Sequence, residues 1–424
     1  MKKRALFAFL ASISTAACLA CGCGGGSSGS VIILDGVEKT QTTSLTVFGN
    51  RADRYSLSVF EDTLQKFMSE NPVIATYEGA AEGYWQALER RFDTDNLDDI
   101  FFIERDRLLT MTEKGALADL SDIVDEKKFN DFARSQLYSA DGNIYAVPTA
   151  ISTYGLYVNY DLLEDNGFKA PANFNEFEEI CEYFKPGITP IICNDYSSIS
   201  SLILAAGTYD IYCGADTAGE IEKINSNPAY LSEHLKAGID FVYLMKENGW
   251  IVTDDALQTG QSKELEKFAT GNYPFMITGG WLSDTLEEKF DLSFDYFIYP
   301  YPIPEKDSVL VAKADLVSVK KGTNEDGAKE LVSLLTSSDT LLLLNDHQSR
   351  FTPLNINSID ASDPIKQSTT SLFKGKFVVS GDIRLTLPLD GYLEKCASLI
   401  LGGNSAESVK AYLDGLLSGG SADE

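Results

Sequence analysis

Strand-like and helix-like segments alternate over residues 44–122, and this alternation restricts the fold more than any other feature of the sequence. SLTVFGN (44–50) alternates in the manner of a strand and ends in a Gly-Asn turn signal. Apolar residues at i, i+3 and i+4 spacing then predict a helix over 55–71, which Pro72 ends. Further strands are predicted at 73–80 and 98–106, and further helices at 83–93 and from 107. This order is typical of an open, doubly wound α/β sheet.

The pattern changes after residue 140. GNIYAVPTAISTYGLYVNYDLL (142–163) is a long apolar and aromatic run that carries the chain onward without a helix. Later strands are predicted at 189–195 and 272–281, and later helices at 173–184, 198–207, 229–249, 324–346 and 405–417. With 424 residues the chain is too long for one ordinary core, so we expect two α/β domains.

The N-terminus has the pattern of an export signal. Three cationic residues, Lys2, Lys3 and Arg4, precede an apolar stretch over 5–20. This stretch is shorter than the roughly 20 residues that span a bilayer comfortably, so residues 1–20 are predicted to be a secretory signal peptide.

Small residues lead from this stretch into cysteine, which resembles the lipobox of bacterial lipoproteins. In that family the signal is cut before a cysteine that then carries a diacylglycerol. We expect lipidation at Cys21, with Cys23 and Cys18 as alternatives, and residues 21–43 as a Gly/Ser-rich flexible tether. A plain cleaved signal with incidental cysteines is the other interpretation.

Charge and cysteine usage exclude some classes of partner and site. The formal net charge of −28 repels phosphate, so nucleic acid is not expected as a partner. The four remaining cysteines show no CxxC spacing and the chain has two histidines, which argues against structural zinc. Cys193 could pair with Cys213, or all four could be buried thiols; the four are Cys181, Cys193, Cys213 and Cys396.

Several stretches, in order, resemble the extracellular solute-binding proteins of ABC sugar importers, the family typified by maltose-binding protein. The most specific is DGNIYAVPTAISTYGLYVNYDLLEDNGFKAPANFNEF, which is similar to the family's first crossover strand and the helix opening after it. FATGNYPFMITGGWL resembles the strand end that places a tryptophan in the ligand cleft. ENPVIATYEGA, DDIFFIERDRLLTMTEKGALADLSD, AKELVSLLTS and LGGNSAESV also fit, so the resemblance covers about residues 44–417.

The resemblance implies two α/β lobes with a ligand cleft between them, in the type II arrangement of periplasmic binding proteins. Lobe 1 would comprise 44–149 and 303–352, and lobe 2 would comprise 150–302 and 353–424. The crossovers would lie near 146–152, 298–302 and 352–355. It also implies a monomer anchored by lipid to the extracellular face of a bacterial membrane, with a carbohydrate ligand, ABC importer transmembrane subunits as partners, and no cofactor or metal.

A sugar site needs aromatic rings for the C–H faces and planar polar groups for the hydroxyls. Trp281 is the first candidate, because it follows Gly280 at the end of an apolar strand, where glycine lets a ligand approach the backbone. Tyr154, just after the first crossover, resembles the family's cleft tyrosine. Polar candidates at strand ends and in late lobe 1 segments are Asn50, Arg51, Asp53, Glu78, Glu104, Asp106, Asn194, Asp195, Asp315 and Arg350. Trp85 and Trp250 are interpreted as packing residues.

Three other functions are weighed against a sugar receptor. The same fold could bind a non-sugar solute. A secreted glycan-active enzyme would need two carboxyls roughly 5–9.5 Å apart; nothing in the sequence singles out such a pair, and HExxH and P-loop motifs are absent. A lipid-anchored adhesin would show tandem all-β modules rather than α/β alternation.

Overall fold

The computed structural model describes residues 30–32, 43–80, 83–193, 195–252, 260–345, 350–355 and 377–419. The predicted signal peptide, the three candidate lipidation cysteines and Asn194 lie outside these residues. Part of the predicted tether is ordered, because β1 (Ser30–Ile32) pairs antiparallel with β3 (Val73–Gly79). An edge strand leaves its backbone donors and acceptors available, and β3 takes a β-branched segment of the supposed linker as its partner.

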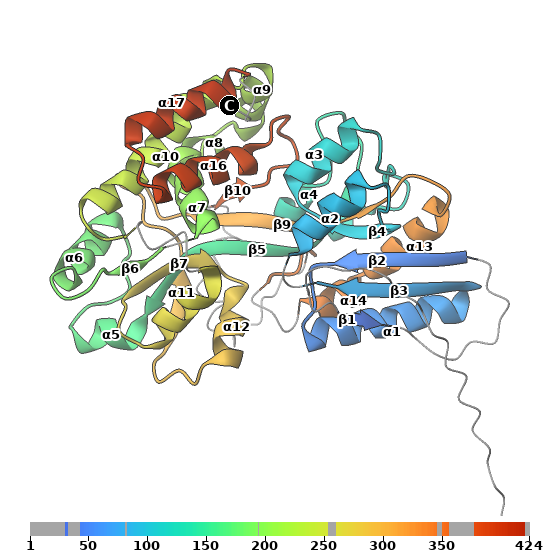
Figure 1. Cartoon of the computed structure of the whole chain (residues 1–424), viewed down its shortest axis with the longest axis horizontal. Coiled ribbons are helices and arrows are strands. Elements are labelled where there is room, and N and C mark those ends of the chain that lie inside the picture. Colours follow the sequence, from blue (N-terminus) through green and yellow to red (C-terminus); the bar gives the residue numbers. More distant parts are fainter. Residues whose placement is uncertain are drawn as a thin grey trace, which may run out of the picture.

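One mixed sheet of ten strands runs through the molecule (Figure 1) in the order β1-β3-β2-β4-β9-β5-β7-β6. β10 adds to β9, and β8 adds to β5. In the first half β2 is parallel to β3 and β4, whereas β9 is antiparallel to β4 and β5. The other strands span β2 Thr43–Gly49, β4 Ile100–Ile103, β5 Ala146–Asn159, β6 Ile191–Ile192, β7 Phe275–Gly279, β8 Tyr296–Tyr299, β9 Leu310–Val319 and β10 Phe377–Ser380.

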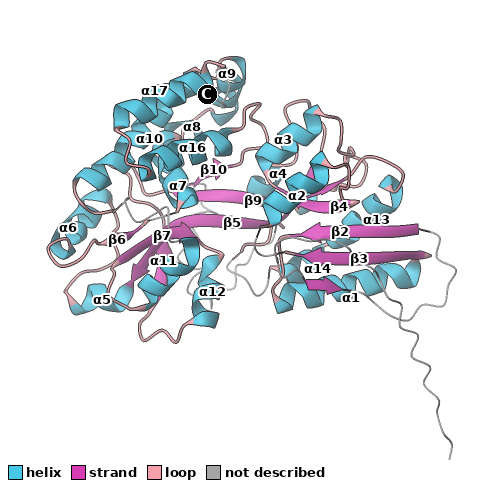
Figure 2. Cartoon of the chain, viewed as in Figure 1, coloured by secondary structure: helices cyan, strands magenta, loops and turns pink. Residues whose placement is uncertain are grey.

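Helices cover this sheet in two groups, which form the two lobes seen in Figure 2. The first group is α1 Arg54–Glu70, α2 Tyr84–Asp93, α3 Arg105–Glu113, α4 Asp131–Ser135, α13 Glu325–Leu335 and α14 Ser338–Leu344. The second is α5 Tyr160–Asp165, α6 Phe174–Phe184, α7 Tyr196–Gly207, α8 Tyr209–Tyr212, α9 Thr217–Ser226, α10 Tyr230–Glu247, α11 Gly260–Ala269, α12 Leu282–Lys289, α16 Leu389–Leu401 and α17 Ala406–Leu417.

Each lobe has its own hydrophobic core. The core of the first lobe contains Leu45, Phe60 and Phe101, and that of the second contains Phe177, Leu202 and Trp250. A smaller cluster around Tyr157 and Phe268 extends the second lobe. Two separate cores joined by long strands permit the lobes to move relative to each other.

Two strands, β5 and β9, pass from one lobe to the other (Figure 1). On one face of β9, Val311 packs in the second core, and Val317 and Val319 pack in the first. The sequence did not predict this strand. It carries the chain back to the first lobe later than the predicted crossover at 298–302, since Tyr301 and Ile303 still belong to the second core.

Other departures from the predictions are local. Helices α9, α11, α12 and α16 were not predicted. All four body cysteines are thiols, so the conceivable Cys193–Cys213 disulfide is not formed. Among the helices that the structure describes, none is long and apolar enough to cross a membrane.

Candidate functional site

The middle of β5 and β9 is polar where the two strands pass between the lobes. The register sets Ser152 opposite Lys313 and Tyr154 opposite Val311, so these four side chains lie on one face of the sheet. Asp315 follows two residues after Lys313 and lies on the same face. Lys313 and Asp315 therefore occupy the stretch of β9 between its two apolar ends.

A small cavity of about 40 Å³ opens above this face. Both lobes line it: Glu104, at the end of β4, comes from the first, and α7 and α16 come from the second. Tyr154 and Lys313 form its floor. The hydroxyls are those of Ser197, Ser200, Ser201 and Ser380, and the α16 carboxylates are those of Asp390 and Glu394. A cavity between two domains, with convergent polar groups, is where a small ligand is expected.

Lys313 is the central cation of this cavity. Its Nζ lies 3.7 Å from the Glu104 carboxylate and 4.0 Å from that of Asp390. Burial lowers the pKa of Lys313, but the surrounding carboxylates, Asp390 foremost, outweigh burial and leave the pKa raised. Glu394 has a raised pKa, because burial and the neighbouring Asp390 both disfavour its charged form. The Glu104 carboxylate also pairs with Arg107.

Tyr154, which lines the cavity, packs against a second aromatic residue, Trp281, which is not part of the lining. The Tyr154 ring meets the Trp281 ring edge-on, with centroids 4.9 Å apart. Trp281 stands directly before α12, and its indole covers Gly279, where a Cβ would come within 2.3 Å of the ring. Gly280 N–H donates to the Thr153 carbonyl at 2.6 Å and ties this strand end to β5. Burial raises the pKa of Tyr154 to about 12, so its hydroxyl remains a donor at neutral pH.

Asp315 joins two arginines that are far apart in the sequence. Its carboxylate lies 3.1 Å from Arg350 Nε and 3.7 Å from Arg51 Nη2, and it accepts from Ser152 Oγ at 3.1 Å. Arg51 is almost fully buried and also donates to the Leu344 carbonyl at 3.2 Å. Burial and the nearby Arg350 lower the pKa of Arg51 to about 10. The three predicted residues Arg51, Asp315 and Arg350 are thus brought together in a largely buried charge cluster, in which Asp315 lies on the same face of the sheet as Lys313.

Asp106 lies at the contact between α3 of the first lobe and α16 of the second. Its Oδ2 accepts from Gly391 N–H at 2.7 Å. Burial and the neighbouring Asp390 raise the pKa of Asp106 to about 7. Asp106 was predicted as a cleft residue, and the structure places it on an inter-lobe contact.

Several other predicted residues have roles within the fold. Asp53 caps α1 by accepting from Ser56 N–H at 2.8 Å, and Asp195 caps α7 by accepting from Ser197 N–H at 3.2 Å. Glu78, near the end of β3, pairs at 2.7 Å with Arg91 of α2. Asn50 is half-buried directly after β2.

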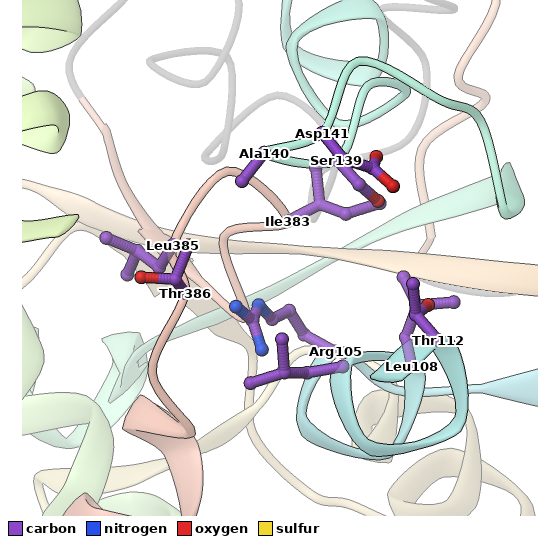
Figure 3. Close-up of a pocket in the computed structure, with 10 residues that line it drawn as sticks. Arg105, Leu108, Thr112, Ser139, Ala140, Asp141, Ile383, Leu385 and Thr386 are labelled. Carbon is purple, nitrogen blue, oxygen red and sulfur yellow. The ribbon is translucent and has the colours of Figure 1, made fainter. Parts of the chain in front are cut away.

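A second, more apolar groove of about 130 Å³ lies beside α3 (Figure 3). Leu108 and Thr112 of α3 line one side, and Ile383, Leu385 and Thr386 line the other. Arg105 crosses its base and donates from Nε to the Asp382 carbonyl at 3.0 Å. No sequence pattern pointed to this groove, because its two sides are more than 270 residues apart in the chain.

Sequence reasoning also missed most of the cavity lining. Lys313, Asp390 and Glu394 belong to elements that were not predicted, and the serines of α7 were not singled out as candidates. One signal was present: Ser197, Ser200 and Ser201 follow the predicted strand at 189–195, where a ligand-facing loop is expected. In the described part of the chain, no group of three or more His, Cys, Asp or Glu side chains is placed to hold a metal ion.

Comparisons with known proteins agree with this architecture. The family model described as bacterial extracellular solute-binding protein matches residues 63–371. A curated protein of Streptococcus pneumoniae serotype 4, named maltooligosaccharide ABC transporter solute-binding lipoprotein, is 26% identical over 144 residues, or 34% of this chain. The match spans about a third of that relative's length, 32%.

Two solved structures share the fold. A chitin oligosaccharide binding protein is similar at a TM-score of 0.72 and 20% identity, over 89% of this chain and 100% of the other. A sugar transporter protein from Bacillus licheniformis, solved in complex with stachyose, is similar at a TM-score of 0.66 and 17% identity, over 88% of this chain and 98% of the other. At these identities the likeness shows the two-lobe fold.

Proposed function

The chain belongs to the family of bacterial extracellular solute-binding proteins, and from this we propose that it is a receptor for a carbohydrate, in particular an oligosaccharide. Because the family consists of binding proteins, the chain is a receptor and not an enzyme. The glycan-active enzyme considered from the sequence is therefore set aside. The cavity between the two lobes is the observation that carries the proposal.

The chemistry of this cavity suits a polyhydroxylated ligand. Carboxylates accept hydrogen bonds from sugar hydroxyls, and charged partners make such bonds stronger. The serine hydroxyls of α7 both donate and accept, while Tyr154, which packs against Trp281, offers an aromatic ring for C–H groups. The curated relative is named for maltooligosaccharide, and the two structural neighbours are named for chitin oligosaccharide and stachyose, which supports a sugar over another solute.

In the proposed mechanism the ligand is captured without chemistry. It would enter between the lobes and rest on the floor formed by β5 and β9, with Glu104 contacting it from one lobe and α7 and α16 from the other. Rotation about the two shared strands would then close the lobes, and the closed form would be the one that an ABC importer recognises.

We further propose that a diacylglycerol on Cys21, Cys23 or Cys18 holds a monomeric receptor at the extracellular face of the membrane. The export-signal pattern supports this, as does the word lipoprotein in the curated relative's name. Anchoring raises the effective concentration of the receptor at its transporter. Mass spectrometry of the membrane-extracted protein would identify the modified cysteine.

A thermal-shift screen tests the ligand class. The protein without residues 1–23 is mixed with maltotriose, raffinose, stachyose and chitotriose while tryptophan fluorescence is followed. A bound sugar at about 100 times its Kd adds about 2.7 kcal/mol to stability, so the melting temperature should rise. Trp281→Ala should abolish the fluorescence response, whereas Trp85→Phe, on α2 and away from the cavity, should leave it unchanged.

The alternative within the same fold is a non-sugar solute. If no saccharide shifts the melting temperature, the ligand class is wrong and the receptor assignment remains.

A further inference from the structure

The cavity between the lobes is smaller than a sugar ring with its hydroxyls. Its volume of about 40 Å³ has room for about three water-sized groups, since one water needs about 10–15 Å³. In this arrangement of the lobes the cavity can therefore receive one substituent of a ligand. The charges and hydrogen-bonding groups of the lining decide which substituent fits.

Carboxylates outnumber cations around the cavity. Glu104, Asp390 and Glu394 are acidic, and Lys313 is the one cation among the described residues that line it. Arg107 pairs with Glu104, so Lys313 is left to balance both Asp390 and Glu394. Its Nζ lies 4.0 Å from Asp390 Oδ2, beyond hydrogen-bond distance, and it reaches Glu394 through space rather than by a hydrogen bond. The lining therefore carries one negative charge more than these cations balance.

Two polar atoms of the lining are buried without a hydrogen-bond partner among the described residues. They are Oδ2 of Asp390 and Oγ of Ser200. The other Asp390 oxygen, Oδ1, accepts from Gly381 N–H at 3.2 Å. A buried acceptor without a donor is costly, so the group that enters should bring donors. An ammonium group brings three donors and a positive charge, whereas a hydroxyl brings one donor and no charge.

We propose that this cavity binds the ammonium group of an amino sugar, so that the ligand of the receptor is a cationic saccharide such as a glucosamine oligomer. Asp390 and Glu394 of α16 and Ser200 of α7 are the acceptors for its three donors. Charge complementarity favours this ligand over a neutral saccharide and disfavours a uronic acid, whose carboxylate would be repelled. The inference rests on the proposed function, because it names the substituent that the same cavity takes.

The bound cation also acts on Glu394. Burial and the neighbouring Asp390 raise the pKa of this carboxyl in the free protein. A positive charge beside it favours the ionised form, so the ligand removes a cost that the empty cavity carries.

Isothermal titration calorimetry with matched pairs of saccharides tests the inference. The pairs are a glucosamine trimer with cellotriose, glucosamine with glucose, and galactosamine with galactose. The members of each pair differ only in an ammonium or a hydroxyl group on each ring. At about pH 6, where an amino group is protonated, the amino form of the pair that fits should bind about tenfold more tightly, because hydrogen bonds to charged groups are the stronger ones.

Glu394→Gln is the variant that tests the site. It keeps the shape of the side chain and removes its charge, so the affinities of the amino and hydroxyl forms should approach each other by about tenfold. Glu233→Gln on α10 is the matched control, since its side chain is 84% exposed and does not line the cavity. This control should keep the wild-type preference. A wild-type circular dichroism spectrum identifies a correctly folded variant.

An amino form that binds no more tightly than its hydroxyl counterpart in every pair overturns the inference. So does a preference that Glu394→Gln leaves undiminished. If neutral saccharides bind without a preference for the amino form, the ammonium site is refuted while the sugar receptor of the proposed function stands. If no saccharide of either kind binds, both the ammonium site and the sugar ligand are refuted.

Discussion

Replacing Asp315 by asparagine should destabilise the protein more than any single surface ion pair could. Asp315 is the carboxylate that faces both Arg51 and Arg350, at 3.7 and 3.1 Å. The Arg51 side chain is 1% exposed and that of Asp315 16%. Asparagine keeps the shape of the side chain and the contact with Ser152, but two guanidinium groups are left close together without a counter-charge.

The magnitude follows from burial rather than from distance. At an effective dielectric constant of about 20, a unit charge pair about 4 Å apart is worth about 4 kcal/mol. Removing one partner of a buried pair costs about 3–5 kcal/mol, because an uncompensated charge remains. We therefore expect Asp315→Asn to lower the free energy of unfolding by about 3–5 kcal/mol.

Glu78→Gln is the matched comparison. The Glu78–Arg91 contact is shorter, 2.7 Å, but the Glu78 side chain is 39% exposed. Arg91 also keeps Asp98 at 2.6 Å. An exposed pair of this kind contributes about 1 kcal/mol or less. The shorter ion pair should therefore be the weaker one.

Urea unfolding at pH 7, followed by tryptophan fluorescence, measures both changes. The reasoning is refuted if Glu78→Gln costs as much as Asp315→Asn, or if Asp315→Asn costs less than about 1 kcal/mol. A second substitution provides an internal check. Arg350→Gln added to Asp315→Asn should restore part of the lost stability, because it removes one of the two uncompensated cations.

Two further substitutions test the packing around the cavity and the inter-lobe segment. Gly279→Ala places a methyl group 2.3 Å from the Trp281 ring, so it should displace the indole, change the tryptophan emission and destabilise the protein by about 1–3 kcal/mol in a thermal scan. The control, Gly415→Ala on α17, has open space around it and should stabilise the protein by about 0.5–1 kcal/mol. Equal effects of the two substitutions would contradict the predicted contact. Tyr212→Phe removes the hydroxyl that donates to the buried Asp382 carboxylate at 3.0 Å and should lower the free energy of unfolding in urea by about 1–3 kcal/mol. Tyr230→Phe, whose hydrogen-bond partner Glu220 is near the surface, should cost less. A larger loss of stability for Tyr230→Phe would refute the prediction.

The first half of the sheet could be predicted from the sequence because its signals are local. The predicted strand at 44–50 corresponds to β2 and the predicted helix at 55–71 to α1, each within a residue or so of the observed bounds. Here the apolar period, the Pro72 stop and the turn residues all agree. The helices that were missed, such as α9 and α12, are short or carry many charges, so their apolar face covers few positions.

The candidate site was harder to predict, because it depends on contacts between distant segments. Tyr154 and Glu104 were predicted and line the cavity. Strand ends carry polar side chains for more than one reason, however. Asp53 and Asp195 cap helices, and Glu78 pairs with Arg91. A sequence does not distinguish a capping carboxylate from a ligand-binding one, since both follow a strand and precede a helix.

β9 shows why the most informative segment was also the one missed. LVAKADLVSV has apolar ends, but Lys313 and Asp315 interrupt them on the face that would have to be buried in an ordinary central strand. Those charges are tolerated because, on the face that carries them, Val311 packs in the core of the second lobe while Val317 and Val319 pack in that of the first, so the middle of this face lies between the two cores. A charged pair inside an otherwise apolar strand is costly in a single core. In a chain long enough for two lobes, the same pattern indicates the strand that joins them and the place where a ligand can reach the sheet.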